Sequence, residues 1–139
     1  MTHELKETES IDVNYPDHEH GRIATALFHR TRAKLIDHDK LGCFICGTRE
    51  HLELHHAKIE YSLSEAVDWN KVRADHQDFN WESFLSDTDF IDSEYNGMVL
   101  CAKHHRDPVC GIHHTPYPFW IAQRYVKDDF KLFANEKGA

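Results

Sequence analysis

The chain has 139 residues, of which 24 are acidic and 16 basic, so its formal net charge is −8 with histidines counted as neutral. An apolar fraction of 40% with 12% aromatics is enough for a core and excludes wholesale disorder. The sequence lacks an apolar run of roughly 18 residues, as a membrane span needs, and a signal peptide. We therefore expect a cytoplasmic protein with no membrane partner, whose cysteines bind metal or act in catalysis in a reducing compartment.

Charge is distributed unevenly along the chain. Residues 1–20 are polar and acidic without apolar periodicity, which predicts a flexible leader ahead of a single domain over 21–139. Residues 21–58 hold seven basic and four acidic side chains, whereas 59–95 hold ten acidic and two basic ones. The net charge therefore does not exclude a polyanionic partner for the mildly basic segments.

The first half of the domain contains three predicted elements. Apolar residues at helical spacing predict an amphipathic helix with a basic side over 22–38, ended by Gly42. Alternation around Leu52 and Leu54 predicts a short strand. Residues 60–94 form an acidic insertion whose aromatic content predicts one or two short helices packed on the core.

The second half continues with a turn, a strand and two helices. Asn-Gly at 96–97 signals a turn, and the apolar run 98–100 predicts a second strand. A helix is expected to begin over 102–106. Pro118 suits the first turn of a further helix, whose apolar stripe extends over 118–133.

Four cysteines and thirteen histidines are the unusual part of the composition. Cys43-Phe44-Ile45-Cys46-Gly47 is a CxxC knuckle, in which two thiolates can share one tetrahedral zinc ion. The second half-site is the CxxH formed by Cys101 and His104, which completes a Cys₃His set typical of structural zinc. Two alternatives remain open: a redox role for the CxxC, and replacement of a distal ligand by Cys110.

Six of the histidines form adjacent pairs at 55–56, 104–105 and 113–114. A zinc ion that joins the two half-sites would hold the first two pairs within one small module. The alternative for any single pair is that its histidines are solvent-exposed surface residues without a shared function. The recurrence of pairs beside expected zinc ligands and strand ends favours a shared function.

Together these motifs resemble the HNH, or ββα-metal, endonucleases. The resemblance rests on a strand ending in His55-His56, on Asn96 five residues before Cys101, and on a CxxH that runs directly into His105. It covers residues 42–106. It implies an α+β fold with a small ββα-metal core and a treble-clef-like zinc site, carrying flanking helices and the acidic insertion.

The resemblance also implies a function and its residues. The expected activity is metal-dependent hydrolysis of DNA phosphodiester bonds, with His56 activating water. His55 and His105 would hold a divalent cation such as Mg²⁺, Mn²⁺ or Ni²⁺, with His113 as a third ligand, while Zn²⁺ is structural. Asn96 would brace the loop and orient the base, and plain turn formation is its alternative role. Because successive strand residues face opposite sides, the strand is expected to end or bulge at the first histidine pair.

The expected partner is DNA, bound with little sequence specificity. Its backbone contacts would come from the basic residues Arg30, Arg32, Lys34, Lys58, Lys103 and Arg106. The acidic insertion over 60–94 is interpreted as a solvated outer face, or as a surface that docks a protein partner or restrains cleavage. The alternative function is a non-catalytic zinc module that binds protein or nucleic acid. Small nucleases of this family often belong to phages or mobile elements.

Overall fold

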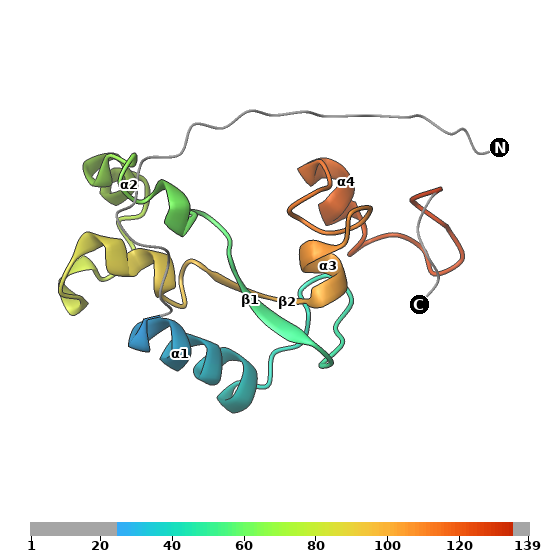
Figure 1. Cartoon of the computed structure of the whole chain (residues 1–139), viewed down its shortest axis with the longest axis horizontal. Helices are drawn as coiled ribbons and strands as arrows, with labels where there is room; N and C mark the ends of the chain where they lie inside the picture. The colour runs from blue at the N-terminus through green and yellow to red at the C-terminus, as the bar shows by residue number, and fades with distance from the viewer. Residues whose placement is uncertain (1–24, 135–139) are drawn as a thin grey trace. The chain divides into compact units, whose positions relative to one another are not determined.

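A computed structural model describes residues 25–134, so the expected leader and the start of the domain lie outside the described residues. The chain divides into two compact units. We call residues 25–41 with 54–99 the aromatic unit, and residues 42–53 with 100–134 the knuckle unit. Figure 1 shows the elements in chain order. Over the described range, no helix has the length and apolar character needed to span a membrane.

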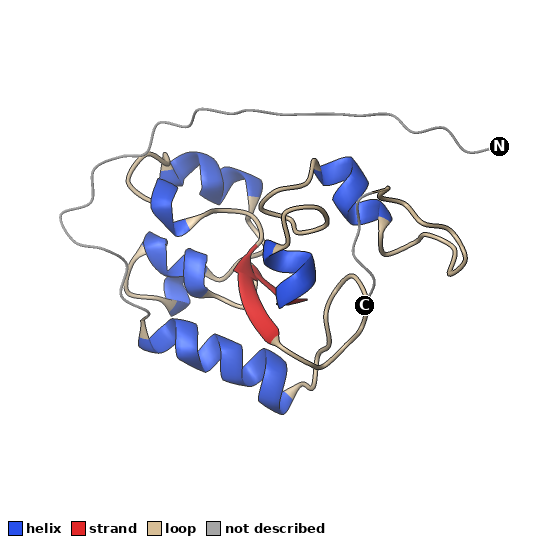
Figure 2. Ribbon diagram, turned by 45° about the vertical axis from the view of Figure 1, so that its right-hand side comes forward, coloured by secondary structure: helices blue, strands red, loops and turns tan. Residues whose placement is uncertain are grey.

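Both predicted strands are confirmed. β1 (Leu52–His56) and β2 (Gly97–Cys101) pair in a two-stranded antiparallel sheet, drawn in red in Figure 2. Beyond their ends, the Ala57 N–H donates to Asn96 O at 2.7 Å and the Ala102 N–H donates to His51 O at 2.9 Å. These two pairs share one antiparallel register, so β1 ends at His56 without a bulge.

A short helix follows the second strand directly. α3 (Ala102–Arg106) begins directly after Cys101, as the sequence predicts. The order β1, β2, α3, with a Cys/His cluster beside it, is consistent with a small ββα-metal fold. The expected α+β class is thus confirmed.

The first predicted helix is confirmed from Ala26 onward. It consists of α1 (Ala26–Arg32) and a π-helical continuation, η1 (Ala33–His38). Buried Leu35 and Ile36 supply its apolar side. The part predicted over 22–24 lies outside the described residues.

The helix ends at His38, as predicted, but Gly42 is not the residue that ends it, which corrects the sequence prediction. The Leu41 N–H donates to Leu35 O at 3.0 Å, a bond that closes the last turn. Lys40 between them has a φ of 58°, the left-handed conformation typical of a helix C-terminus. The chain therefore leaves the helix through Lys40, two residues before the glycine.

The acidic insertion folds into short helices, as its aromatic content predicts, but into four of them rather than one or two. They are η2 (Tyr61–Leu63), α2 (Trp69–Asp75), η3 (Trp81–Ser83) and η4 (Asp87–Asp92), of which only α2 is α-helical. Asp68 caps α2 by accepting a hydrogen bond from the Asn70 N–H at 3.0 Å. Arg73 on α2 pairs with Asp87 at 2.5 Å, so part of the acidic charge is neutralised locally.

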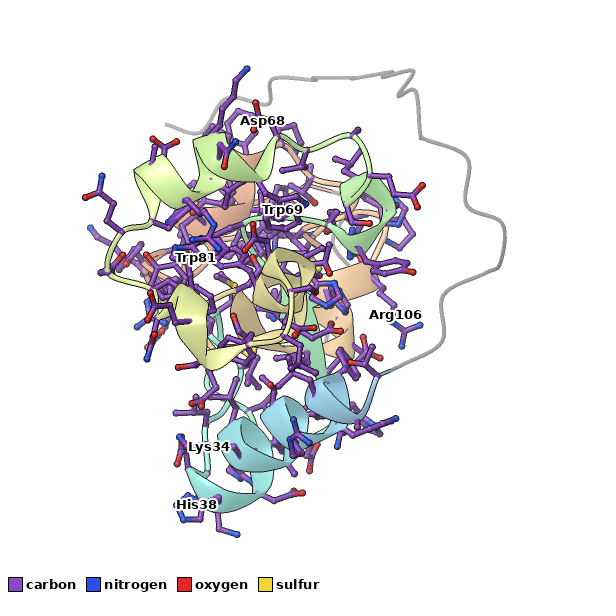
Figure 3. The ribbon with its side chains drawn as sticks, turned by 90° about the vertical axis from the view of Figure 1, so that its left-hand side faces the viewer. Lys34, His38, Asp68, Trp69, Trp81 and Arg106 are labelled. Carbon is purple, nitrogen blue, oxygen red and sulfur yellow. The ribbon has the colours of Figure 1, made fainter. Side chains whose placement is uncertain are left out.

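The core of the aromatic unit is built around Phe90, which is 0% exposed. Its ring stacks on Trp81 at a centroid distance of 5.2 Å and contacts Phe79 edge-on at 5.0 Å. Trp69 packs edge-on against Phe90 at 6.3 Å and against Trp81 at 6.4 Å. Figure 3 labels the two tryptophans. Aromatic pairs of this kind contribute more to the stability of the fold than the burial of their apolar area alone.

Replacing Phe90 by alanine should therefore be among the most destabilising core changes in the aromatic unit. Removal of a fully buried phenyl ring leaves a cavity and costs about 3–5 kcal/mol of unfolding free energy. Leu85→Ala is the matched control, because Leu85 is 103% exposed and its truncation should change stability by less than about 0.5 kcal/mol. Urea unfolding followed by tryptophan fluorescence measures both; equal effects of the two variants would contradict this packing.

The core of the knuckle unit contains Trp120, which is fully buried. Its indole Nε1–H donates to His104 O at 2.8 Å and so connects α4 (Tyr117–Ala122) to α3. The helix predicted over 118–133 is wrong beyond Ala122. Tyr125 and Phe130 in the expected apolar stripe are exposed, so no buried surface supports a longer helix there.

Candidate functional site

Three thiols and one imidazole meet in the knuckle unit. We call Cys43, Cys46, Cys101 and His104 the Cys₃His cluster. One ligand atom from each lies within 4.8 Å of the others, so the cluster could hold a metal ion. The sequence prediction had grouped these four residues from their spacing alone.

The separations within the Cys₃His cluster fit a tetrahedral ion. The Sγ atoms of Cys46 and Cys101 are 3.9 Å apart. His104 Nδ1 lies 3.3 Å from Cys101 Sγ and 3.9 Å from Cys43 Sγ. A zinc ion with Zn–S of about 2.3 Å and Zn–N of about 2.0 Å separates tetrahedral ligands by about 3.5–3.8 Å. The donor set and its spacing therefore fit zinc.

The thiols of the cluster differ in their pKa. Burial works to raise the pKa of Cys43, but hydrogen bonds from His104 and from nearby backbone N–H groups lower it to about 6. Burial raises the pKa of Cys101 to about 11; the backbone N–H of His104 opposes this rise, and the charge of Cys43 adds to it. The Cys43 thiolate forms readily, and its negative charge opposes ionisation of Cys101. A bound cation would relieve this repulsion between the two thiolates.

The knuckle that carries the first two thiols is a tight turn. The Cys43 N–H donates to Thr48 O and the Gly47 N–H donates to Cys43 O, both at 2.8 Å. Gly47 has a φ of 78°, which favours glycine. A Cβ on Gly42 would overlap the Gly47 carbonyl oxygen, so this position also needs glycine.

The fourth cysteine lies outside the cluster. Cys110 is buried, and its thiol faces the carboxylate of Asp107 with Sγ 3.4 Å from Oδ2. The alternative in which Cys110 replaces a distal ligand is therefore wrong for this structure. All four cysteines are free of disulfides.

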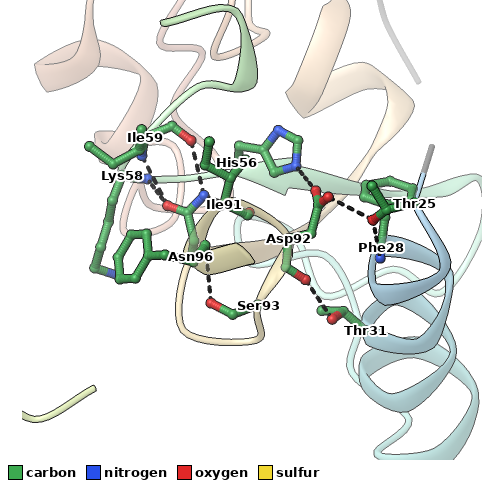
Figure 4. A network of polar contacts seen from close by, with 11 residues as sticks. Thr25, Phe28, Thr31, His56, Lys58, Ile59, Ile91, Asp92, Ser93 and Asn96 are labelled. Carbon is green, nitrogen blue, oxygen red and sulfur yellow. Dashed lines mark hydrogen bonds and ion pairs between the residues drawn. The ribbon is translucent and has the colours of Figure 1, made fainter. Parts of the chain in front are cut away.

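His56, at the end of β1, faces an acidic partner. Its Nε2 lies 3.0 Å from Oδ1 of Asp92, and the two side chains are only 11% and 8% exposed (Figure 4). Thr25 Oγ1 donates to the other carboxylate oxygen at 2.8 Å. The Phe28 ring packs edge-on against the imidazole at a centroid distance of 5.9 Å. The imidazole is thus held by an acceptor and by an aromatic ring.

Asn96 is fully buried directly before β2 and ties two backbone segments together. Its Oδ1 accepts from the N–H groups of Lys58 and Ile59 at 2.8 and 2.9 Å. Its Nδ2 donates to Ile59 O at 3.0 Å and to Ile91 O at 2.8 Å (Figure 4). The amide therefore does more than form a turn with Gly97, because it fixes the chain that follows His56.

A second group of polar side chains lies in the knuckle unit. His105 Nδ1 is 2.8 Å from Oε1 of Glu53, and Arg106 binds the same carboxylate through two nitrogens at 2.8 and 2.7 Å. The Nε2 atoms of His105 and His113 are 2.9 Å apart. Glu53 therefore fixes one side of the His105 ring while the other side meets a second imidazole.

His55 is buried on β1, two residues after Glu53. Side chains two residues apart on a strand project from the same face. His55 therefore lies on the same face as Glu53, and His56 lies on the opposite face.

The six basic residues expected to contact DNA differ in their surroundings. Arg30 and Arg32 are exposed on α1. Lys34 forms ion pairs with Asp39 at 2.8 Å and with Glu94 at 2.9 Å. Lys58 donates to Tyr95 O at 3.0 Å, Arg106 pairs with Glu53, and Lys103 is half-buried. Lys34 and Arg106 are therefore already paired with carboxylates.

Comparison with known families gives this geometry a context. Residues 43–107 match the family model of the HNH endonucleases. We call residues 43–107, the part of the chain that matches this model, the HNH segment. The segment includes the whole Cys₃His cluster, both histidines at the end of β1, and Asn96. Searches of the curated proteins and of the solved structures found no match. The family match supports a nuclease-type function.

Two carboxylates of the HNH segment escaped the sequence analysis. Asp92 belongs to the segment that the sequence predicts to be an acidic outer face, yet it is buried beside His56. Its signal was the apolar pair Phe90-Ile91 directly before it, which places residue 92 at the edge of a core. Glu53 lies between the two leucines whose alternation predicts the strand, where a polar side chain is ordinary. The feature that could have pointed to its role is its position two residues before His55, on the same face of the strand.

Replacing Glu53 by glutamine should destabilise the protein near pH 7 but not in acid. Partial burial works to raise the pKa of Glu53, but hydrogen bonds from Arg106 and His105 hold it below the ordinary 4.5. A lowered pKa stabilises the folded state above the unfolded value, and this stabilisation disappears as pH falls through the folded value. Because Arg106 is exposed, solvent screens the pair, and we expect about 0.5–1 kcal/mol.

Urea unfolding of wild type and Glu53→Gln at about pH 7 and about pH 3 measures this difference. Glu50→Gln removes an exposed carboxylate from the same segment and is the matched control. A difference between wild type and Glu53→Gln that persists unchanged at the lower pH would contradict the assigned ion pair.

Proposed function

We propose that this chain is an HNH-type endonuclease, a metal-dependent hydrolase of DNA phosphodiester bonds. The observation that carries the proposal is the family match over 43–107, a segment that contains His56, Asn96 and the Cys₃His cluster. Within this proposal the Cys₃His cluster holds Zn²⁺ as a structural ion. Closed sets of three thiolates and one imidazole are typical of such sites.

A second cation, such as Mg²⁺, Mn²⁺ or Ni²⁺, is assigned to His55 and His105, with His113 as a third ligand. The 2.9 Å between the Nε2 atoms of His105 and His113 supports the last two. Adjacent nitrogen ligands of an octahedral ion at about 2.1 Å would be about 3 Å apart. The Glu53 carboxylate behind His105 is the kind of partner that orients metal-ligating imidazoles. A divalent cation held there supplies positive charge against the charge developing on the phosphoryl oxygens.

His56 is the general base of the proposed reaction. Neutral imidazole accepts a proton near pH 7, and a water molecule that gives up its proton to the ring attacks the phosphorus. The bond from phosphorus to the departing sugar oxygen breaks, and that oxygen takes a proton from solvent. Asn96 holds the chain after His56 in place and adds no charge that would bias the ring.

DNA contacts in this proposal are made to the phosphate backbone. They are assigned to Arg30, Arg32, Lys34, Lys58, Lys103 and Arg106. At Lys34 and Arg106 a phosphate has to compete with the carboxylates already paired there. Backbone contacts carry little sequence information, so cleavage is expected at many sequences and with a rate that falls steeply with salt.

The test is cleavage of supercoiled plasmid by the full chain. The protein is freed of loosely bound cations with a weak chelator, its zinc content is measured, and Mg²⁺, Mn²⁺ or Ni²⁺ is added. We expect about one retained zinc per chain and nicking that depends on the added cation. No cleavage with any cation would overturn the proposal in favour of the non-catalytic zinc module. Cleavage of a structured RNA but not of the plasmid would overturn the DNA assignment.

A further inference from the structure

We infer that Asp92 is a positioning residue that fixes the tautomer of His56, so that Nδ1 is the ring nitrogen that accepts the proton. The inference deepens the proposed function and rests on it, because it adds a residue to the role given to His56. It starts from the buried pair in Figure 4, in which His56 Nε2 and Asp92 Oδ1 are 3.0 Å apart.

The chemistry of the acceptor decides which nitrogen carries the proton. An ionised carboxylate has no proton to donate, so a ring nitrogen at 3.0 Å from Asp92 Oδ1 must itself be the donor. The proton of neutral His56 therefore sits on Nε2, and the lone pair is on Nδ1. A half-turn of the ring would present a C–H to the carboxylate, so Asp92 selects the orientation of the ring as well.

The carboxylate is held from a second element. Thr25 Oγ1 donates to Asp92 Oδ2 at 2.8 Å and accepts from the Phe28 N–H at 2.9 Å, so one hydroxyl both caps α1 and holds the carboxylate. Thr31 Oγ1 donates to the backbone oxygen of Asp92 at 2.6 Å. The bond from Thr25 holds the carboxylate, which cannot turn away from His56 without losing it, whereas the bond from Thr31 reaches only the main chain.

This arrangement leaves His56 with a single ring nitrogen, Nδ1, that can accept a proton. With Nε2–H donated to Asp92, the proton from water goes to Nδ1, and the resulting imidazolium lies against a carboxylate that offsets its charge. Phe28 packs against the same ring and further restricts it. Asp92 does not touch the reacting atoms; it acts through His56.

The sharpest variant is Asp92→Asn, because an asparagine amide can donate to Nε2 and so favours the tautomer with the proton on Nδ1. Thr31→Val is the matched control: it removes a hydrogen bond from the backbone of Asp92 and leaves its carboxylate in place. The first readout is the ¹⁵N spectrum of neutral His56 in the full chain without added divalent cation, assigned by the loss of its signals in His56→Ala. The second is kcat and KM on plasmid.

We expect wild type and Thr31→Val to show the Nε2–H tautomer, and Asp92→Asn to shift toward Nδ1–H. The kcat of Asp92→Asn should fall by roughly 10²- to 10⁴-fold with little change in KM, while that of Thr31→Val stays near wild type. An Nδ1–H tautomer in wild type would overturn the inference without any variant, even if Asp92→Asn failed to fold. Equal losses of kcat in the two variants, with the tautomer unchanged, would overturn it in favour of a purely structural Asp92. If wild type cleaves nothing, the proposed function fails, and the spectrum still decides whether Asp92 sets the tautomer.

Discussion

Substituting His56 by alanine should reduce plasmid cleavage by roughly 10²- to 10⁴-fold, the usual contribution of a positioned general base. The alanine cannot accept the proton from water, and it leaves the Asp92 carboxylate with Thr25 as its remaining contact among those described above. Loss of that hydrogen bond also costs about 1–3 kcal/mol of stability, so the assay temperature must lie well below the unfolding transition. Initial rates of nicking at saturating cation give the comparison.

His114→Ala is the control for this experiment, because His114 is exposed and has no assigned role in the reaction. Its nicking rate should stay within about twofold of wild type, and both variants should retain the zinc content of wild type. A His56→Ala protein that is folded and nicks plasmid at the wild-type rate would remove His56 from the chemistry. The non-catalytic zinc module would then be the better description of the chain.

Removal of the proposed structural zinc should unfold the knuckle unit. Structural zinc sites contribute about 10–16 kcal/mol of apparent binding free energy near pH 7, which is more than a domain of this size has in reserve. Cys43→Ser takes away one of the three thiolates, and a strong chelator takes away the ion itself. Both should abolish the slow-exchanging amides of residues 42–53 and 100–106 in hydrogen exchange, with loss of zinc measured by atomic absorption.

Cys110→Ser provides the matched comparison, since the Cys110 thiol faces Asp107 and lies outside the Cys₃His cluster. This variant should keep about one zinc per chain and its protected amides. The assignment would fail if Cys43→Ser bound zinc as wild type does, or if the chelator removed zinc and left hydrogen exchange unchanged.

Elements with local signals were predicted well from the sequence. The two strands followed from alternation and from an apolar run, and the Cys₃His cluster followed from two spacings of the same length. The end of the first helix at His38 was predicted, but the residue that ends it was not, because Lys40, a residue with a side chain, takes the left-handed conformation that glycine usually supplies. The long C-terminal helix was wrong because periodicity does not reveal whether a surface exists to bury the stripe, and Tyr125 has none.

The carboxylates beside the histidines had no comparable signal. Asp92 is separated from His56 by 36 positions along the chain, and Glu53 is separated from His105 by 52. Such pairs form only when distant segments meet, so neither composition nor spacing identifies them. The sequence therefore predicts the imidazoles that carry the proposed chemistry, while the groups that orient them become visible only in three dimensions.

The amide of Asn96 has a consequence for how the chain can vary. The segment between the strands, which we call the excursion, begins with Ala57 and ends with Asn96. The side chain of Asn96 accepts hydrogen bonds from the Lys58 and Ile59 N–H groups, and its backbone oxygen accepts one from Ala57, so the two ends of the excursion are joined at one residue. The entropy of closing such an excursion grows slowly, by about 0.6 kcal/mol for each doubling of its length. Extra residues spliced into an exposed turn, such as the one at Leu85, should therefore leave the strand register intact, and this excursion is where the chain can best accommodate added length.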